Sequence, residues 1–373
     1  MKPPGRLGGS GLFTRRNLLS LAGASVLAMA GQHGPARTKS SVPTRGINMP
    51  GWFDRPDGVA PTPAVLEKLR HRGFETVRLP IDGDLVLAGA SNLLAIGKGI
   101  ERLVATGFAV LADLHPAAAL YTTLRATPLA GGKRVVEAWR VLSTVVADLP
   151  EDKVYPELLN EPPVSPADWL VLRGRLAEIV RAACPKHTIV WGPAPDQGIW
   201  QLAGMPPLDD DRQIAAVHFY APTAFTHQCQ PWGASPLARI HDLPFPATRD
   251  MPAVRKTIAA LRSTGDMDAA LLVEEQMTGD WTQAAIHAEL RRAAEWSAAT
   301  GCPLMLNEFG VLDFCVGAIS RQTWIRAVRR AAEENGIGWA VWELDQGFGV
   351  IADRTDIEGF DDAMFEALFR EGE

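Results

Sequence analysis

The stretch Tyr155-Pro156-Glu157-Leu158-Leu159-Asn160-Glu161-Pro162 ends a short, mainly apolar run on an asparagine and a glutamate. A second stretch, Pro303-Leu304-Met305-Leu306-Asn307-Glu308-Phe309-Gly310, repeats this order. Runs of this length that stop at Pro or Gly are typical of buried parallel strands. A carboxylate that follows such a strand points toward the face where α/β barrels carry out chemistry. Either Asn-Glu pair alone fits a solvated loop or a helix cap, but two in matching contexts predict paired acids.

Strand-like and helix-like segments alternate along most of the chain. The strands are expected at 45–49, 76–80, 109–114, 154–160, 188–191, 214–219, 304–308 and 338–342. Helices are expected at 63–72, 166–183 and 322–335, after the N-caps Thr62 and Ser165 and before the glycine Gly336. This order predicts an α/β fold, a (β/α)8 TIM barrel. An open doubly wound sheet is the alternative, but no Gly-rich phosphate loop follows the first strand.

The connection between Phe219 and Leu304 is far longer than an ordinary βα unit. Its first part, 220–249, is rich in Pro, Phe, Trp and His, and two helices are expected later, at 253–263 and 282–299. A long aromatic-rich insertion after the sixth strand lies on the catalytic face of a barrel. It therefore predicts a substrate wall rather than a separate domain.

The composition excludes several classes of partner. The 373 residues are 47% hydrophobic and 21% charged, as in a soluble globule with a large core. The formal net charge is −6, and the first thirty residues carry basic side chains and no acid, so the remainder is more acidic still. Because no basic stripe is present, nucleic acid and an anionic membrane surface are not expected as partners.

The N-terminus predicts an export signal over residues 1–30. Arg15-Arg16 precedes an apolar stretch, 18–30, which ends in the small-x-small pattern Ala28-Met29-Ala30. The stretch is too short to span a bilayer comfortably, and the paired arginines resemble a twin-arginine signal. An ordinary secretory signal or an uncleaved anchor are the alternatives. We expect a flexible arm at 31–43, the catalytic barrel at 44–373, a periplasmic or secreted location, and no stable membrane insertion after cleavage.

The four cysteines, Cys184, Cys229, Cys302 and Cys315, fit no metal-knuckle spacing. One disulfide is plausible in an oxidising compartment. Cys229 and Cys315 are the preferred pair because both follow predicted strand ends on adjacent loops. The other two precede strands, where buried thiols are usual.

Further polar and aromatic residues stand at predicted strand ends. Each alone has a structural explanation, such as a core ion pair or core filling, but jointly they place polar groups at one barrel mouth. They are Arg78, His115, His218, Tyr220 and Trp342.

This set resembles glycoside hydrolase family 5, whose retaining enzymes carry catalytic glutamates after strands four and seven. The match runs from Arg45-Gly46-Ile47-Asn48 to Trp342-Glu343, and Phe225-Thr226-His227-Gln228 resembles bacterial endoglucanases of the family. The family positions are filled in order by Arg78, His115, Asn160, Glu161, His218, Tyr220, Glu308 and Trp342. The resemblance implies an exported endo-acting cellulase that cleaves β-1,4-glucan, with a polysaccharide or oligosaccharide substrate and no cofactor or metal.

By the same resemblance, Glu161 is the acid/base and Glu308 the nucleophile. Arg78 would favour the charged form of Glu308, Tyr220 would orient it, and its charge would raise the pKa of Glu161. Asn160 would donate to the sugar 2-OH. The two histidines, His115 and His218, would shape the site and hydrogen-bond sugar or carboxylate, while Trp342 would offer a flat apolar face. No role is assigned to Asn307.

Four loop tryptophans could add sugar-binding platforms or be structural: Trp52, Trp200, Trp232 and Trp281. The segment 192–197 lacks the aromatic residue expected there from related endoglucanases, so the polymer stays open. Mannan, xyloglucan and mixed-linkage glucan are alternative substrates.

Two other classes of function compete. A metal-dependent barrel hydrolase would use Asp113, His115, His218 and a glutamate, yet no His-x-His or His-Glu-x-x-His pattern is present. A glycan-binding protein without activity would need neither Glu161 nor Glu308, so the presence of both argues against it.

Overall fold

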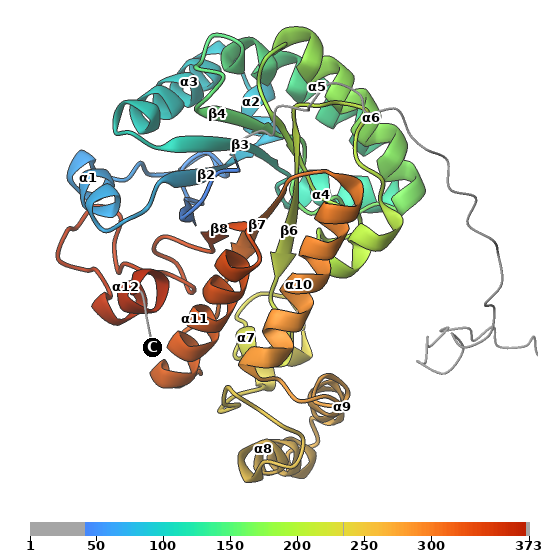
Figure 1. Ribbon diagram of the computed structural model, residues 1–373, viewed down its shortest axis with the longest axis vertical. Coiled ribbons are helices and arrows are strands. Elements are labelled where there is room, and N and C mark those ends of the chain that lie inside the picture. Colours follow the sequence, from blue (N-terminus) through green and yellow to red (C-terminus); the bar gives the residue numbers. More distant parts are fainter. Residues whose placement is uncertain (1–41, 234, 371–373) are drawn as a thin grey trace, which may run out of the picture. The chain divides into compact units, whose positions relative to one another are not determined.

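The computed structural model describes residues 42–233 and 235–370, in which eight parallel strands close into a barrel (Figure 1). The strands are β1 Gly46–Asn48, β2 Thr76–Asp82, β3 Ala109–His115, β4 Val154–Glu157, β5 Ile189–Trp191, β6 Gln213–Phe219, β7 Leu304–Phe309 and β8 Gly338–Val341. The predicted (β/α)8 barrel is confirmed. The predicted export signal, and the arm up to residue 41, lie outside the described residues.

Helices surround the barrel (Figure 1). They are α1 Pro63–His71, α2 Gly83–Leu87, α3 Ala90–Ala105, α4 Ala118–Ala126, α5 Pro128–Val146, α6 Pro166–Ala183, α7 Thr223–Thr226, α8 Pro252–Ser263, α9 Met267–Gln276, α10 Gln283–Thr300, α11 Ala318–Glu334 and α12 Asp362–Phe369, with 3-10 turns η1 Ile199–Gly204 and η2 Pro236–Arg239. The side chains of Thr62 and Ser165 cap α1 and α6 as expected. In the described part of the chain, none of the helices is both long and apolar enough to cross a membrane.

The long connection after β6 holds α7, η2, α8 and α9 before α10 returns to the barrel. In Figure 1, α8 and α9 lie at the outer end of α10, away from the strands. Helices α8 and α10 were expected from the sequence. Helix α9 was not, because its buried residues are mostly small (Ala269, Ala270 and Val273). A disulfide joins Cys229, in this connection, to Cys315 after β7.

The barrel interior changes from apolar to polar along the strands. The inward-facing apolar residues include Leu111 on β3, Tyr155 on β4 and Met305 on β7. Two residues later on β3 and β4, Asp113 and Glu157 occupy the same face, because strand side chains alternate with period two. Both carboxylates are fully buried. The strands therefore hold a polar layer above an apolar core, and this layer supports the mouth of the barrel.

Candidate active site

A single guanidinium organises the polar layer. Arg78 is fully buried and contacts the carboxylates of Asp113 (3.0 Å), Glu157 (2.7 Å) and Glu308 (2.5 Å). Burial lowers the pKa of Arg78, but the three carboxylates outweigh it and the pKa is raised, so the side chain stays cationic. Burial raises the pKa of Glu157. One buried cation thus contacts three acids at once.

The end of β7 is irregular, and this aims Glu308 into the site. Val217 pairs with Leu306, but the next residue of β6, His218, pairs with Glu308. Asn307 is therefore the extra residue of a β-bulge. In a regular strand Asn307 and Glu308 would point to opposite faces. The bulge allows both side chains to reach the polar layer.

Both carboxylate oxygens of Glu308 have a donor. Arg78 donates from Nη1 to Oε1, and the hydroxyl of Tyr220 donates to Oε2 at 2.9 Å. Burial and the charge of Glu308 raise the pKa of Tyr220, so its hydroxyl keeps its proton. The side chain of Glu308 is only 6% exposed. These contacts fix the Glu308 carboxylate in one orientation.

Glu161 lies just beyond β4, which ends at Glu157 rather than at the predicted residue 160. The chain turns at Glu161, whose φ of 38° is strained for a residue with a side chain. Its backbone N–H donates to Oε1 of Gln197 at 3.0 Å, which holds this turn. The Glu161 side chain is 35% exposed, in contrast to Glu308.

Burial is the main cause that raises the pKa of Glu161. The charge of Asp113 adds to it, while His115 and Arg78 oppose it. The predicted cause was the charge of Glu308, so the physical origin differs although the direction of the pKa shift agrees. A raised pKa is what a general acid requires.

His218 lies between the two glutamates. Its Nδ1 is 2.9 Å from Oε1 of Glu161 and 3.4 Å from Oε2 of Glu308. Burial lowers the pKa of His218 to about 4, so the ring is neutral near pH 7. One oxygen of Glu161 and one of Glu308 lie within 4.8 Å of each other. The two acids therefore share one small space.

The remaining predicted site residues line the same mouth. Asn160 accepts from Arg78 at Oδ1, and its Nδ2 lies 3.3 Å from Nε2 of His115. Nδ1 of His115 contacts Asp113 at 2.8 Å. Burial lowers the pKa of His115, but Asp113 outweighs it and the pKa is raised. The ring of His115 stacks at 6.0 Å on Trp342, which closes this side of the mouth.

Four residues that the sequence did not single out belong to the same hydrogen-bond network as Arg78 and Glu308: Asn48, Glu157, Gln197 and Asn307. Nδ2 of Asn307 donates to Oε1 of Glu157 at 2.7 Å, and Nε2 of Gln197 donates to Glu157 and to Asn307, each at 3.3 Å. Asn48 accepts from Arg78. The sequence held one signal for this network: a charged residue, Glu157, inside a buried strand. Such a side chain needs buried hydrogen-bond partners, which indicates further polar residues around it.

The four loop tryptophans separate into different environments. Trp52 is 8% exposed, stacks on Phe53 at 4.9 Å and lies under Arg102 of α3, which favours the structural alternative for this residue. The indole of Trp281 donates to the carbonyl of Gln276 within the insertion. Trp200 packs under Arg292 of α10. Trp232 is half exposed and contacts aromatic residues that lead to the catalytic pair.

One group of described residues has the donor spacing of metal ligands, namely Glu161, His218 and Glu308. It differs from the set expected for a metal-dependent hydrolase, since Asp113 binds Arg78 and His115 instead. A cation at Glu308 would face the positive charge of Arg78 on the same carboxylate. The donor set fits a pair of catalytic acids better than a metal centre.

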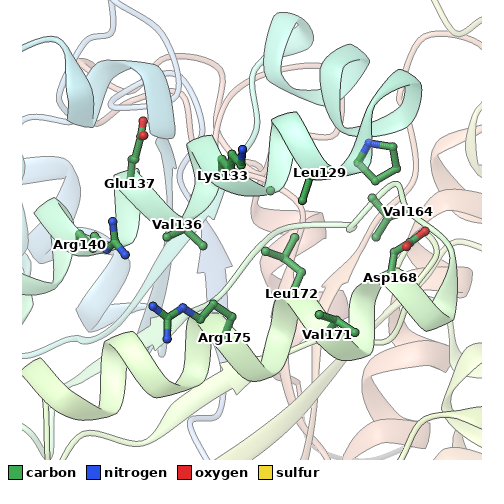
Figure 2. A pocket seen from close by; sticks show the side chains of 12 residues that line it. Leu129, Lys133, Val136, Glu137, Arg140, Val164, Asp168, Val171, Leu172 and Arg175 are labelled. Atoms are coloured by element: carbon green, nitrogen blue, oxygen red, sulfur yellow. The ribbon is translucent and has the colours of Figure 1, made fainter.

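A separate hollow lies between α5 and α6 on the outer ring of helices (Figure 2). It encloses about 560 Å³ and is lined by apolar side chains such as Leu129, Val136 and Leu172, with Lys133 and Arg175 near them. None of the predicted site residues lines it. The acids of the barrel mouth and this groove are therefore unrelated features.

Residues 36–347 match the family model described as Cellulase (glycosyl hydrolase family 5). Endoglucanase 3 of Fibrobacter succinogenes is 30% identical over 349 residues, which cover 86% of this chain and 52% of that protein. The chain thus spans about half the length of this curated relative.

Solved structures share the fold. Cellulose synthase subunit Z of Clostridioides difficile has a TM-score of 0.71 at 22% identity and covers 88% of this chain and 99% of that one. Thermotoga maritima Cel5A in complex with cellobiose has a TM-score of 0.72 at 23% identity, with 89% and 99% covered. The same enzyme in complex with mannotriose gives 0.71 at 23% identity, also with 89% and 99% covered.

Proposed function

This chain belongs to glycosyl hydrolase family 5, and on this premise we propose that it hydrolyses internal β-1,4 bonds of glucan with retention of configuration. The observation that carries the proposal is the approach of Glu161 and Glu308 to within 4.8 Å. Carboxyl groups about 5–5.5 Å apart are typical of retaining pairs, while inverting pairs lie about 6.5–9.5 Å apart to admit a water molecule. The spacing favours direct attack by a carboxylate on the sugar.

In the first step, Glu308 attacks the anomeric carbon. A bond forms between its carboxylate oxygen and that carbon as the bond to the leaving oxygen breaks. Arg78 and Tyr220 hold the attacking carboxylate in place by hydrogen bonds to its two oxygens. Glu161 gives its proton to the leaving oxygen, and burial supports this role by raising its pKa. The products are a shortened chain and a glycosyl ester on Glu308.

In the second step, water attacks the ester. Esterification removes the charge of Glu308, and Glu161 is now a carboxylate that accepts a proton from the water. Neutral His218 keeps its hydrogen bond to Glu161 through both steps, because its pKa of about 4 leaves it uncharged. Release of the sugar restores the proton on Glu161 and the charge on Glu308.

The relatives support a β-linked glucan as substrate. The curated relative is named an endoglucanase, and one neighbouring structure contains cellobiose. A second contains mannotriose, which keeps mannan as the alternative substrate. The stacked Trp342 and His115 offer a flat wall for a sugar ring.

We also propose that the protein is exported to the periplasm or secreted. The twin-arginine-like N-terminus supports export. The disulfide between Cys229 and Cys315 supports an oxidising compartment, since cytosolic thiols are kept reduced.

The test is hydrolysis by the purified protein of carboxymethylcellulose, glucomannan, xyloglucan and mixed-linkage glucan. We expect the β-1,4-glucan to be cleaved, with viscosity falling before many reducing ends appear. Glu308→Ala is expected to abolish turnover with an unchanged circular dichroism spectrum, because Arg78 keeps Asp113 and Glu157 as partners. Undiminished hydrolysis by this variant would contradict the proposal.

A further inference from the structure

We propose that the loops after β6, β7 and β8 form a second sugar-binding surface that holds a glucan residue beyond the one under attack. This surface, the aromatic platform, consists of Trp232, Phe314 and Phe348. The inference rests on the proposed function, because its ligand is the same chain that Glu308 attacks.

A continuous series of ring contacts leads from the nucleophile to the platform. The hydroxyl of Tyr220 donates to Glu308, and the ring of Tyr220 lies 6.0 Å from that of Phe348. Phe348 in turn lies 6.3 Å from Trp232. His227 contacts all three of these rings, at 5.1 Å from Tyr220, 5.3 Å from Phe348 and 6.5 Å from Trp232. The platform is therefore continuous with the reacting centre.

Two members of the platform present free aromatic surface. Trp232 is 49% exposed and Phe314 is 51% exposed, whereas Phe348 beneath them is 5% exposed. Phe314 lies directly over Gly347: a Cβ at that glycine would stand 2.5 Å from Cζ of the ring. Exposed apolar surface that adjoins a binding groove is typical of an interaction site. The apolar C–H face of a sugar ring is the matching ligand next to a glycosidase centre.

The histidine that contacts the platform is uncharged. Burial lowers the pKa of His227 to about 4, so its ring is neutral near pH 7. Its Nδ1 lies 2.9 Å from Oγ1 of Thr226, which also donates to the carbonyl of Tyr220. A neutral, hydrogen-bonded surface of this kind suits an uncharged glucan rather than an anionic polymer.

Cross-links between the three loops hold the platform in place. The disulfide between Cys229 and Cys315 joins the β6 and β7 loops, and Leu312 N–H donates to the carbonyl of Thr226 at 2.9 Å. Asp313 N–H donates to the carbonyl of Gly347 at 2.9 Å, which ties the β7 loop to the β8 loop. Rigid loops lose little freedom on binding, so the platform is pre-organised for its ligand.

The first measurement is the calorimetric Kd of cellohexaose in the Glu308→Ala background, where the sugar is not cleaved. Adding Trp232→Ala or Phe314→Ala is expected to raise this Kd about 3- to 10-fold, the loss of one stacking contact. Trp232→Phe keeps an aromatic face and is expected to retain most of the affinity. Leu129→Ala, which removes a 77% exposed apolar side chain from α5, is the matched control and leaves the Kd unchanged.

The second measurement separates failure of the platform from failure of the proposed function. A single-sugar reagent, 2,4-dinitrophenyl 2-deoxy-2-fluoro-β-glucoside, labels the nucleophile without reaching neighbouring sugar sites. In proteins that keep Glu308, we compare kcat/KM for cellohexaose hydrolysis with the rate of labelling. The platform variants are expected to lower the first at least three-fold more than the second. Equal losses on both, or an unchanged cellohexaose Kd, would overturn the platform. If the unsubstituted protein neither labels nor hydrolyses, the proposed function itself fails.

The Cys229→Ser/Cys315→Ser double variant tests the cross-link. Without the disulfide the β6 and β7 loops are less constrained, so the Kd of cellohexaose is expected to rise, as it does for Trp232→Ala. The single-sugar reagent is still expected to label Glu308. Affinity equal to that of the disulfide-bonded protein would contradict the role of the cross-link. If this variant does not fold, the single substitutions at the exposed Trp232 and Phe314 decide the proposal.

Discussion

One carboxylate oxygen of Glu161 lies within 4.8 Å of one of Glu308, although Glu161 follows β4 and Glu308 lies on β7, with β5 and β6 between these strands in the barrel. Their environments are unequal. Glu308 is 6% exposed and bound by Arg78 and Tyr220, whereas Glu161 is 35% exposed and contacts neutral His218. This inequality suits Glu308 to the proposed role of nucleophile and Glu161, whose pKa burial raises, to that of proton donor.

Replacing the proton donor should remove one limb of the pH profile. Glu161→Gln is expected to lower kcat by roughly 10²–10⁴-fold, the usual contribution of a general acid. In the unsubstituted enzyme kcat/KM should fall as pH rises through the pKa of Glu161, which burial raises above its ordinary value. The measurement is kcat/KM against pH for both proteins. A basic limb that survives the substitution would contradict the assignment.

Removing the buried cation Arg78 should lower the free energy of unfolding of the barrel. Arg78→Met leaves Asp113 and Glu157 buried without their cation, which costs about 3–5 kcal/mol for a broken buried pair. The check is the free energy of unfolding in urea. Arg175→Met is the control, because its ion pair with Glu178 is exposed and is worth about 1 kcal/mol or less. Equal effects of the two substitutions would show that the buried network does not stabilise the fold.

The strand-end positions were predictable because strand side chains alternate and parallel strands end on one face. That rule found Glu308, and it should also have found Glu157, four residues before Glu161 at an inward-facing position. Arg78 was assigned to a strand end, but it is the third of the seven residues of β2. The role of Asn307 was not predictable, because a β-bulge shifts the pairing after Val217 and no local residue type announces it.

Loop residues were less predictable than strand residues. Trp52 and Trp232 both stand in loops rich in turn-forming residues, yet one is buried and the other half exposed. Packing between separate segments decides that difference: the ring of Trp52 lies under Arg102 of α3, and Trp232 rests on Phe348, far along the chain. Gln197 was missed for the same reason, since its partners Glu157 and Asn307 come from other strands.

Glu343 should make stability depend on pH. It is fully buried and accepts backbone N–H groups of Asp345, Gln346 and Phe348, and burial raises its pKa from 4.5 to about 7. A raised pKa in the folded state means that the stabilisation is complete below pH 4.5 and is lost as pH rises through about 7. The loss amounts to about 3 kcal/mol.

Urea unfolding at pH 4.5 and pH 8 measures this contribution. Glu343→Gln carries no charge, so its free energy of unfolding should change less between the two pH values than that of the unsubstituted protein. Parallel changes in both proteins would show that Glu343 is not the group responsible.

Chelation should not affect catalysis. Because Arg78 and Tyr220 already occupy the two oxygens of Glu308, we expect hydrolysis rates to be unchanged after dialysis against EDTA. The check is the initial rate before dialysis, after dialysis, and after return of Zn²⁺ or Mn²⁺. Lost activity that a metal restores would assign the Glu161, His218 and Glu308 group to metal binding instead.

The stereochemistry of hydrolysis tests the central claim most directly. Proton NMR during the first minutes of cellohexaose cleavage distinguishes the two anomers of the new reducing end before they equilibrate. Attack by Glu308 followed by water from the same face predicts that the β-anomer appears first. Initial appearance of the α-anomer would show single displacement by water and would contradict the assignment of Glu308 as nucleophile.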